Sequence, residues 1–546
     1  MSAHETILSL DRLSVRLPRG ADRTHALRGV SLDIASNEIL CVVGESGSGK
    51  SMMANAIMRL LPDEVTIDGG SMLFEGRDLC AATPAEMREV RGAGIAMIFQ
   101  EPMTALNPLR TIGDQIAEMF SIHTDLSKAE INARVLSLLA DVRIPDPKVA
   151  AKAYPHELSG GQRQRAMIAM ALALDPKLLI ADEPTTALDV TTQAQILKLI
   201  RDLQQRRKTA VMFITHDFGV VAEIADRVVV MQHGLIVEQG AASAVLAHPQ
   251  HAYTKQLIAA VPPLKAPPPR ALAADNILTI TDVSKTYRTG GFLGRGARVT
   301  PAVRNVSLNL PRGATLGIVG ESGSGKSTLA RCIVRLIDPD SGSIVLDGSD
   351  WAKLSREQVR RETRHIQMVF QDPFASLNPR RKAAELVAQG PIVHGTPRAE
   401  ALANARELFA LVGLDPSAGD RYPHEFSGGQ RQRIGLARAL ALKPDVLVAD
   451  EPVSALDVSV QAQVLKLLAD LRQRLGLSIV FITHDLRVAA QICDLVAVMK
   501  DGEVVEHGLA GEVFGTPQHP YTQALLDSIP GGEFAREHET AGLAGA

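Results

Sequence analysis

This 546-residue sequence has few cysteines, few aromatic residues, no long apolar run and a net charge of only −3. Its four cysteines lie far apart and form no CxxC pair or metal-ligand spacing, which excludes a disulfide framework and suits a reducing compartment. The small net charge argues against a basic nucleic-acid binder. No apolar run reaches the roughly 18 residues that a membrane helix needs, and the first residues do not resemble a signal peptide. We therefore expect a soluble protein that reaches a membrane only through a partner.

The sequence consists of two similar halves. The motif GESGSGKS occurs at 44–51 and 320–327, and SGGQRQR occurs at 159–165 and 427–433. From the second motif onward the two halves keep a constant spacing, which indicates two full-length units rather than small stacked repeats. Prolines between the halves favour an extended linker. The expected organisation is a first domain over 1–260, a linker over 261–275, a second domain over 276–530 and a disordered tail over 531–546.

Each GESGSGKS motif follows a strand pattern, with residues 6–17 and 29–43 alternating or running apolar in the first half. Its glycines allow backbone N–H groups to face a phosphate chain, and the helix that follows adds its positive end. Lys50 and Lys326 are predicted to reach the β- and γ-phosphates. The hydroxyls of Ser51 and Ser327 are predicted to bind Mg²⁺. We call the two motifs the phosphate loops; their residues are Gly44, Glu45, Ser46, Gly47, Ser48, Gly49, Lys50 and Ser51, and Gly320, Glu321, Ser322, Gly323, Ser324, Gly325, Lys326 and Ser327.

Two acidic residues end a buried-strand pattern in each half, within ADEPTTALDV and ADEPVSALDV. A buried strand that breaks into a loop at two carboxylates suits a bound Mg²⁺ and a water positioned for attack. Asp182 and Asp450 are predicted to hold Mg²⁺ through water. Glu183 and Glu451 are predicted to orient or deprotonate the attacking water.

A glutamine and a histidine end two further strand patterns. Gln100 and Gln371 can contact the metal or the attacking water, although one copy alone would fit a surface amide in a turn equally well. His216 and His484 follow apolar runs within the sequence THD. Because each histidine comes after the two carboxylates in both halves, we predict a contact to the γ-phosphate rather than a structural role.

Helical periodicity fills residues 111–158 and 381–426, which we interpret as small helical subdomains. Each subdomain ends in SGGQ directly before a helix predicted over 163–174 or 431–442. A serine and glycines at a helix start make a second anion site. This suggests a sandwich in which the phosphate loop of one half and the SGGQ of the other bind one nucleotide, a geometry that spacing alone does not fix. The residues concerned are Ser159, Gly160, Gly161, Gln162, Ser427, Gly428, Gly429 and Gln430.

With these motifs, each half resembles the nucleotide-binding subunit of an ATP-binding-cassette (ABC) transporter over nearly its whole length. Walker A, Q-loop, signature, Walker B, D-loop (187–189 and 455–457) and switch histidine are present twice. The resemblance implies an α/β fold with two tandem P-loop NTPase (ABC ATPase) domains, each a RecA-like core with an antiparallel β subdomain and a helical subdomain. The segments QEPMTALNP, QDPFASLNP, PQHAYT and PQHPYT resemble the dipeptide/oligopeptide/nickel importer branch. The layout is most similar to the fused ATPase of microcin C-type peptide importers.

The resemblance implies an ATPase that uses ATP and Mg²⁺ to power peptide import across the bacterial inner membrane. Implied partners are two transmembrane permease subunits and a periplasmic substrate-binding protein, with no nucleic acid and membrane contact only through the permease, at the cytoplasmic face. Glutathione, nickel and an antibiotic peptide stay open as alternative substrates. A ribosome-associated twin-cassette ATPase is disfavoured by the short proline-rich linker, and a DNA-repair ATPase by the lack of CxxC pairs and heptads. A non-hydrolysing module is disfavoured by two intact Asp-Glu pairs.

The sequence departs from the family pattern at several positions. Neither tail carries a cysteine, so no iron–sulfur cluster is expected. Family members stack adenine on an aromatic residue before Walker A; Tyr287 fits this role, but the aligned residue of the first half is Leu17. The phosphate loop is followed by Thr328 in the second half and by Met52 in the first. We expect weaker nucleotide binding in the first half and two hydrolysis-competent sites; the PQHAYT and PQHPYT tails could pack or regulate.

Overall fold

The computed structural model describes residues 5–186, 188–289, 298–372, 376–454 and 456–532. It forms two compact units, one with 1–188, 192–261 and 530–546, the other with 189–191 and 262–529. Ala187 and Ala455 of the D-loops, and all of the predicted disordered tail except Gly531 and Gly532, lie outside the described residues. In the part of the chain that the structure describes, no helix combines the length and the apolar character needed to cross a membrane.

The first half contains two sheets. Four strands form an antiparallel sheet in the order β2 (His25–Ala35), β1 (Thr6–Arg16), β4 (Thr66–Phe74) and β5 (Arg77–Asp78). Six strands form the second sheet in the order β10 (Leu235–Ala241), β9 (Arg227–Gln232), β3 (Ile39–Val43), β8 (Ala210–Thr215), β7 (Leu178–Asp182) and β6 (Ile95–Ile98). All neighbours in the second sheet are parallel except β9 and β10. Strands buried on both faces explain the continuous apolar runs of β3, β7 and β8.

Two local predictions for the first half need correction. The strand pattern over 29–43 is two strands, β2 and β3, separated by a turn in which Asn37 adopts a left-handed φ of 59°. The helix predicted over 163–174 begins at Gly160 and ends at Ala171. Its earlier start follows from a capping box, in which the side chains of Ser159 and Gln162 each accept a hydrogen bond from the other residue's backbone N–H.

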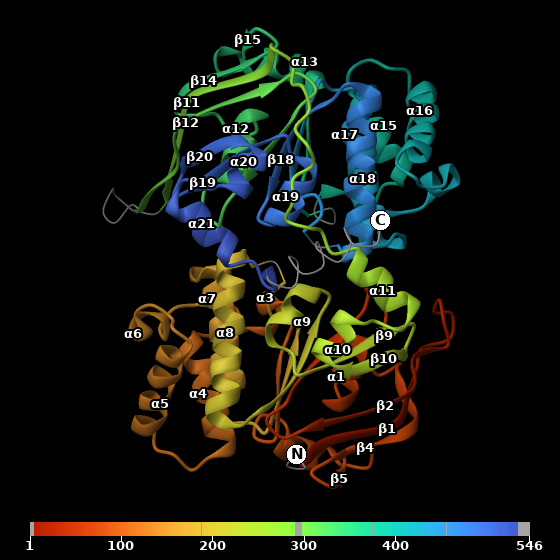
Figure 1. Cartoon of the computed structure of the whole chain (residues 1–546), viewed down its shortest axis with the longest axis vertical. Coiled ribbons are helices and arrows are strands. Elements are labelled where there is room, and N and C mark those ends of the chain that lie inside the picture. Colours follow the sequence, from red (N-terminus) through yellow and green to blue (C-terminus); the bar gives the residue numbers. More distant parts are fainter. Residues whose placement is uncertain (1–4, 187, 290–297, 373–375, 455, 533–546) are drawn as a thin grey trace. The chain divides into compact units, whose positions relative to one another are not determined.

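The helices of the first half separate into a group beside the six-stranded sheet and a helical subdomain. In Figure 1, α4, α5 and α6 lie together on one side of α8, away from strands β1, β2, β4 and β5. The helices in chain order are α1 (Lys50–Ile57), α2 (Pro84–Val90), α3 (Pro102–Ala105), α4 (Ile112–His123), α5 (Lys128–Asp141), α6 (Pro147–Ala150), η1 (Pro155–Glu157), α7 (Gly160–Ala171), α8 (Val190–Arg207), α9 (Phe218–Ile224), α10 (Ala242–Ala247) and α11 (Ala252–Ala259).

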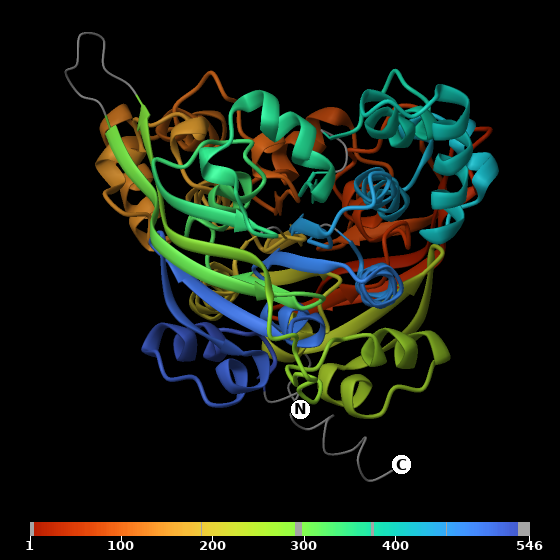
Figure 2. The same cartoon turned by 90° about the horizontal axis from the view of Figure 1, so that it is seen from above.

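The second half repeats this plan. Its antiparallel sheet has the order β12 (Arg298–Pro311), β11 (Asn276–Thr289), β14 (Ser341–Leu346) and β15 (Ser349–Asp350). Its six-stranded sheet has the order β16 (Ile366–Val369), β17 (Val446–Asp450), β18 (Ser478–Thr483), β13 (Thr315–Val319), β19 (Leu495–Lys500) and β20 (Glu503–Leu509). Figure 2 shows the green strands β11 and β12 beside the blue strands β19 and β20, and the N–H of Arg304 on β12 donates to the carbonyl of Gly502 at 2.8 Å.

The helices of the second half match those of the first. The predicted start at residue 431 again needs correction, because α17 begins at Gly428 behind the cap of Ser427. The described helices are α12 (Lys326–Ile333), η3 (Trp351–Lys353), α13 (Arg356–Glu362), η4 (Thr363–His365), α15 (Ala383–Val393), α16 (Arg398–Leu411), η5 (Pro416–Asp420), η6 (Pro423–Glu425), α17 (Gly428–Leu440), α18 (Val458–Leu475), α19 (Leu486–Ile492), α20 (Ala510–Gly515) and α21 (Pro520–Asp527).

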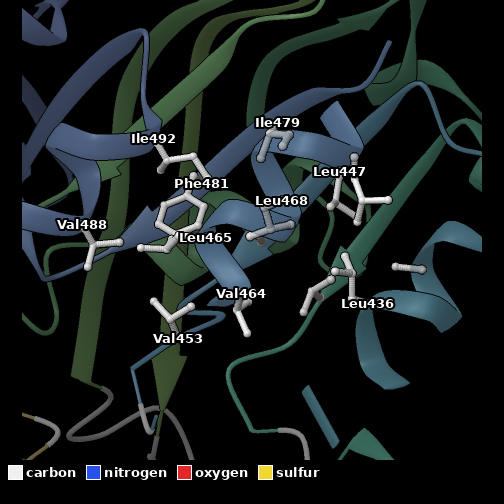
Figure 3. Close-up of a cluster of buried hydrophobic side chains, with 14 of the residues drawn as sticks. Leu436, Leu447, Val453, Val464, Leu465, Leu468, Ile479, Phe481, Val488 and Ile492 are labelled. Carbon is white, nitrogen blue, oxygen red and sulfur yellow. The ribbon is translucent and has the colours of Figure 1, made fainter. Parts of the chain in front are cut away.

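Helices α18 and α19 cover the strands that carry the acidic residues and the histidine. Phe481 of β18 is fully buried among Leu465 of α18 and Val488 and Ile492 of α19 (Figure 3). Leu447 of β17 is fully buried in the same cluster. This packing holds the carboxyl ends of β17 and β18 in place, because both strands are fixed by their apolar neighbours as well as by hydrogen bonds.

Candidate functional site

The predicted site residues of each half meet at one edge of its six-stranded sheet. Strands β3, β6, β7 and β8 are parallel, so their carboxyl ends lie at the same edge. The phosphate loop follows β3, Asp182 ends β7, Thr215 ends β8 and Gln100 lies two residues after β6. The second half places its phosphate loop and acidic residues in the same way on β13, β16, β17 and β18.

Each phosphate loop is wrapped around the ammonium group of its own lysine. Lys50 Nζ donates hydrogen bonds to the carbonyls of Gly44 at 2.7 Å and Glu45 at 3.0 Å. Lys326 Nζ donates to the carbonyls of Gly320 and Glu321, both at 2.7 Å. Burial lowers the pKa of Lys326. A buried cation inside a loop of backbone amides fits a phosphate anion, which would supply the opposite charge.

The glycine before each lysine allows the loop to pass close to a neighbouring strand. Gly49 and Gly325 adopt left-handed φ angles of 109° and 104°. A Cβ at Gly49 would lie 2.8 Å from the carbonyl oxygen of Ala26, and one at Gly325 would lie 2.2 Å from that of Ala302. Any side chain here would therefore clash with backbone that cannot move aside, and it would also strain the φ angle.

The serine and the first carboxylate of each site converge on one point. Ser51 Oγ donates to Asp182 Oδ1 at 3.0 Å, and Ser327 Oγ donates to Asp450 Oδ1 at 3.0 Å. Burial raises the pKa of Asp182 to about 6, although the hydrogen bond from Ser51 acts to lower it. Burial also raises the pKa of Asp450. Hydroxyl and carboxylate oxygens are ligands that Mg²⁺ prefers. A carboxylate whose charge is disfavoured by burial fits a site completed by a divalent cation.

The second carboxylate lies between the glutamine and the histidine. In the first half, Gln100 Nε2 donates to Glu183 Oε2 at 3.2 Å, and His216 Nδ1 lies 3.4 Å from the same oxygen. In the second half, Gln371 Nε2 donates to Glu451 Oε2 at 2.8 Å, and His484 Nδ1 lies 3.2 Å from Glu451 Oε1. The structure therefore brings together all six residues that were predicted to be catalytic, three in each half.

The glutamates are held ionised in an uncommon backbone conformation. Burial alone would raise the pKa of Glu183, but the hydrogen bond and charge of His216 outweigh it and lower the pKa to about 2. His484 lowers the pKa of Glu451 in the same way, and the pKa of His484 is raised in return despite its burial. Glu183 and Glu451 have φ angles of 45° and 47°, which are costly for residues other than glycine. A carboxylate with so low a pKa is a weak base near pH 7, which favours orienting a water over deprotonating it.

The SGGQ residues of each half lie at the start of a helix, α7 or α17. Their serine and glutamine side chains are engaged in the capping boxes of α7 and α17. A Cβ at Gly160 or at Gly428 would meet no atom within 4 Å. The space beside these glycines at the first turn of both helices is therefore open, as an anion site requires.

The residues that differ between the halves also differ in their surroundings. Tyr287 lies on β11 opposite Thr300 and is partly buried. Leu17 and Met52 of the first half pack against the apolar core formed by the antiparallel sheet, the six-stranded sheet and α1. Thr328 of the second half is partly buried on α12.

Sequence reasoning left open the role of two tyrosines that contact the phosphate loops. The hydroxyl of Tyr253 accepts a hydrogen bond from the backbone N–H of Glu45 at 3.1 Å. The hydroxyl of Tyr521 accepts one from the N–H of Glu321 at 3.3 Å. The signal was present in the repeated PQHAYT and PQHPYT segments, but local patterns could not show what the tyrosines contact.

Comparisons with known proteins identify the family to which the chain belongs. The family model "ABC transporter" matches residues 27–186 and 303–454, and the model "Oligopeptide/dipeptide transporter, C-terminal region" matches 237–282 and 505–545. The peptidoglycan transport ATP-binding protein YejF of Agrobacterium fabrum (strain C58) is 48% identical over 527 residues, which cover 96% of each chain. The glutathione import ATP-binding protein GsiA of Escherichia coli (strain K12) is 45% identical over 564 residues, 97% of this chain and 90% of GsiA. Among solved structures, the dimeric ATP-binding cassette MJ0796 with ADP and Pi aligns with 43% of this chain and 98% of its own at 32% identity and a TM-score of 0.39.

The chain belongs to the ABC transporter ATP-binding proteins, which bind ATP and hydrolyse it to power transport. It carries two fused cassettes, one in each half. Because the oligopeptide/dipeptide transporter region follows both cassettes, the chain is the ATPase of a peptide-type importer. Proteins of this family act with membrane permeases.

Proposed function

We propose that both cassettes bind and hydrolyse ATP with Mg²⁺ through the residues that meet at the sheet edge. The observation that carries this proposal is the repeated cluster, in which a serine–aspartate pair and a glutamine–glutamate–histidine group occur with matching contacts in both halves. The phosphate loops would hold the triphosphate, and Ser51 with Asp182, and Ser327 with Asp450, would hold Mg²⁺. Gln100 and Gln371 would contact the metal or the attacking water as the cassettes change conformation.

The two carboxylates of each site have separate tasks in this proposal. Asp182 and Asp450 would bind the metal through water, since each already contacts the serine hydroxyl that shares the ion. Glu183 and Glu451 would hold the attacking water, and His216 and His484 would contact the γ-phosphate. Ser159–Gln162 and Ser427–Gln430 would provide a second phosphate-binding element through the N-termini of α7 and α17.

We propose a peptide as the transported substrate. The two relatives are named for peptidoglycan transport and glutathione import, and glutathione is itself a tripeptide. Glutathione is therefore the alternative within the same chemical class, and nickel is a second one from the same importer branch. We propose that the chain holds no iron–sulfur cluster, because neither carboxyl-terminal tail contains a cysteine.

We propose two permease subunits and a periplasmic binding protein as partners, with the chain bound peripherally at the cytoplasmic face of the inner membrane. Support comes from the segment that follows each glutamine. Leu109, just after the LNP of the first half, is 85% exposed. The corresponding stretch of the second half is the basic sequence Arg380–Lys382. An exposed leucine and a basic cluster at equivalent positions suit two different docking partners.

Co-purification from gently solubilised native membranes tests this proposal. Mass spectrometry should identify two multi-span permease subunits with the full chain, and ATP hydrolysis by the complex should rise on adding the cognate binding protein loaded with a peptide. A complex stimulated only by nickel would contradict the peptide assignment. Recovery of ribosomes without any permease would contradict the importer assignment itself.

A further inference from the structure

The carboxyl-terminal region of each cassette carries the segment HxYT, at His251–Thr254 and His519–Thr522, which we call the HxYT segment. Its histidine is the N-cap of a short helix, α11 or α21. The N–H of Tyr253 donates to His251 Nδ1 at 3.2 Å, and the N–H of Tyr521 donates to His519 Nδ1 at 3.1 Å. The cap fixes the direction in which the tyrosine leaves the helix, because the tyrosine is only two residues from the capping side chain.

A carboxylate on the sheet fixes the start of this segment. Both oxygens of Glu238 on β10 accept hydrogen bonds, from the N–H of Gln250 at 2.7 Å and from that of His251 at 3.0 Å. Glu506 on β20 accepts the equivalent bonds from Gln518 at 2.7 Å and His519 at 3.1 Å. Burial tends to raise the pKa of Glu238 and of Glu506, but these backbone hydrogen bonds contribute to a net lowering of the pKa in both. The segment is therefore tied to the sheet by an ionised side chain.

The tyrosine side chain is buried and its hydroxyl contacts the phosphate loop. Tyr253 is 6% exposed and Tyr521 is 9% exposed. Burial raises the pKa of Tyr521 far above its usual value, so its hydroxyl stays protonated near pH 7. Each hydroxyl accepts from the N–H of the second residue of its loop, Glu45 or Glu321.

The residue held by the tyrosine is also the residue that holds the lysine. In the first cassette, the carbonyl of Glu45 accepts from Lys50 Nζ at 3.0 Å and from the N–H of Ser48 at 3.1 Å. In the second, the carbonyl of Glu321 accepts from Lys326 Nζ at 2.7 Å and from the N–H of Ser324 at 3.2 Å. A continuous path of contacts thus leads from the sheet through the HxYT segment to the lysine.

We propose that Tyr253 and Tyr521 are positioning residues of the ATP sites, which keep the first turn of each phosphate loop in its binding shape. When the lysine leaves the glutamate carbonyl to reach a phosphate, the tyrosine hydroxyl still holds the same residue by its N–H. This inference rests on the proposed role of the phosphate loops in binding ATP. The inference gives the oligopeptide/dipeptide transporter region a function within its own cassette, namely to support the phosphate loop.

The test uses the full chain with one phosphate loop disabled at a time. Tyr253→Phe is made together with Lys326→Ala, so that nucleotide binds only to the first cassette; Tyr521→Phe is made together with Lys50→Ala. Binding of Mg·ADP, which avoids hydrolysis during the titration, is measured by calorimetry. Phenylalanine keeps the ring and removes only the hydroxyl, so the Kd should rise about fivefold to tenfold, the effect expected for one lost hydrogen bond.

Tyr154→Phe is the matched control, because it removes the same atom from a ring that is 40% exposed. It should leave the Kd within about twofold, a change below the weakest expected hydrogen-bond effect. In the permease complex, the KM for ATP should rise with Tyr253→Phe and kcat should stay unchanged, a split that general loss of stability would not produce. An unchanged Kd in both tyrosine variants would overturn the inference.

A second variant keeps the test decisive if the tyrosine variants fold poorly. Glu238→Gln weakens the anchor on β10 without touching the loop or the tyrosine, and it should raise the Kd of the first cassette while Mg·ADP binding to the second stays unchanged. An unchanged first-cassette Kd in this variant would also count against the inference. Failure of the proposed function would look different, because Mg·ADP would then bind normally to a chain in which both Lys50 and Lys326 are alanine.

Discussion

Replacing Asp182 with asparagine should make the nucleotide-free chain more stable at neutral pH. Burial raises the pKa of Asp182 from 3.8 to about 6. At about 1.4 kcal/mol for each pKa unit, ionisation of this side chain lowers the free energy of unfolding by up to about 3 kcal/mol. The penalty is fully present above pH 6, shrinks as the pH falls toward 3.8, and is absent below that value. The amide keeps an oxygen that can accept from Ser51 but carries no charge.

The assay is the melting temperature of the metal-free full chain between pH 5 and pH 8. For a cassette of this size, about 3 kcal/mol corresponds to roughly 5 °C, so Asp182→Asn should melt about 5 °C higher at pH 7.5 and lose about half of that gain by pH 5. Mg·ATP should reverse the order, because the variant lacks the metal-binding charge. Glu183→Gln is the control with the opposite sign: the lowered pKa of Glu183 means that its ionisation stabilises the fold, so this variant should melt lower. If Asp182→Asn destabilises the chain equally at pH 7.5 and pH 5, the reasoning is refuted.

Three further predictions concern the adenine contact, the phosphate loop and the core. Tyr287→Ala should weaken nucleotide binding to the second cassette by roughly 1–3 kcal/mol, and Leu17→Tyr should strengthen nucleotide binding to the first. Both affinities are measured by titration with the phosphate loop of the other cassette disabled. Affinities equal to those of the unchanged chain in both variants would contradict the stacking of adenine on Tyr287. Gly49→Ala should abolish nucleotide binding to the first cassette, because its Cβ would lie 2.8 Å from the Ala26 carbonyl oxygen, and wild-type affinity would show that the loop can relax. Phe481→Ala should lower the free energy of unfolding of the second cassette by about 3–5 kcal/mol in denaturant titrations, and a loss below about 1 kcal/mol would mean that the core closes around the cavity.

The meeting of the candidate site residues at the sheet edge could be predicted from the sequence because they occupy or directly follow strand ends. A strand buried on both faces reads as an uninterrupted apolar run, and the first polar residue after it marks the sheet edge. Asp182 and Glu183 could therefore be placed beside the phosphate loop without coordinates. Their opposite pKa shifts could not be predicted, because they depend on which one faces His216.

Helix starts and contacts between residues far apart in the sequence were harder to predict from the sequence. Helix α7 begins at Gly160 although glycine is a poor helix former, because the reciprocal bonds of the capping box satisfy the N–H groups of Ser159 and Gln162. The contact of Tyr253 with Glu45 joins residues 208 positions apart, so no local periodicity could reveal it. Only the occurrence of the HxYT segment in both halves indicated that the segment has a function.

The central claim is that both cassettes hydrolyse ATP to drive one importer. The most direct measurement is the ATP turnover of the permease complex with Glu183→Gln and Glu451→Gln introduced one at a time. Loss of the water-orienting carboxylate should reduce turnover by at least about tenfold in each variant. Wild-type turnover in either variant would show that the corresponding cassette does not contribute to hydrolysis and would contradict the two-site account.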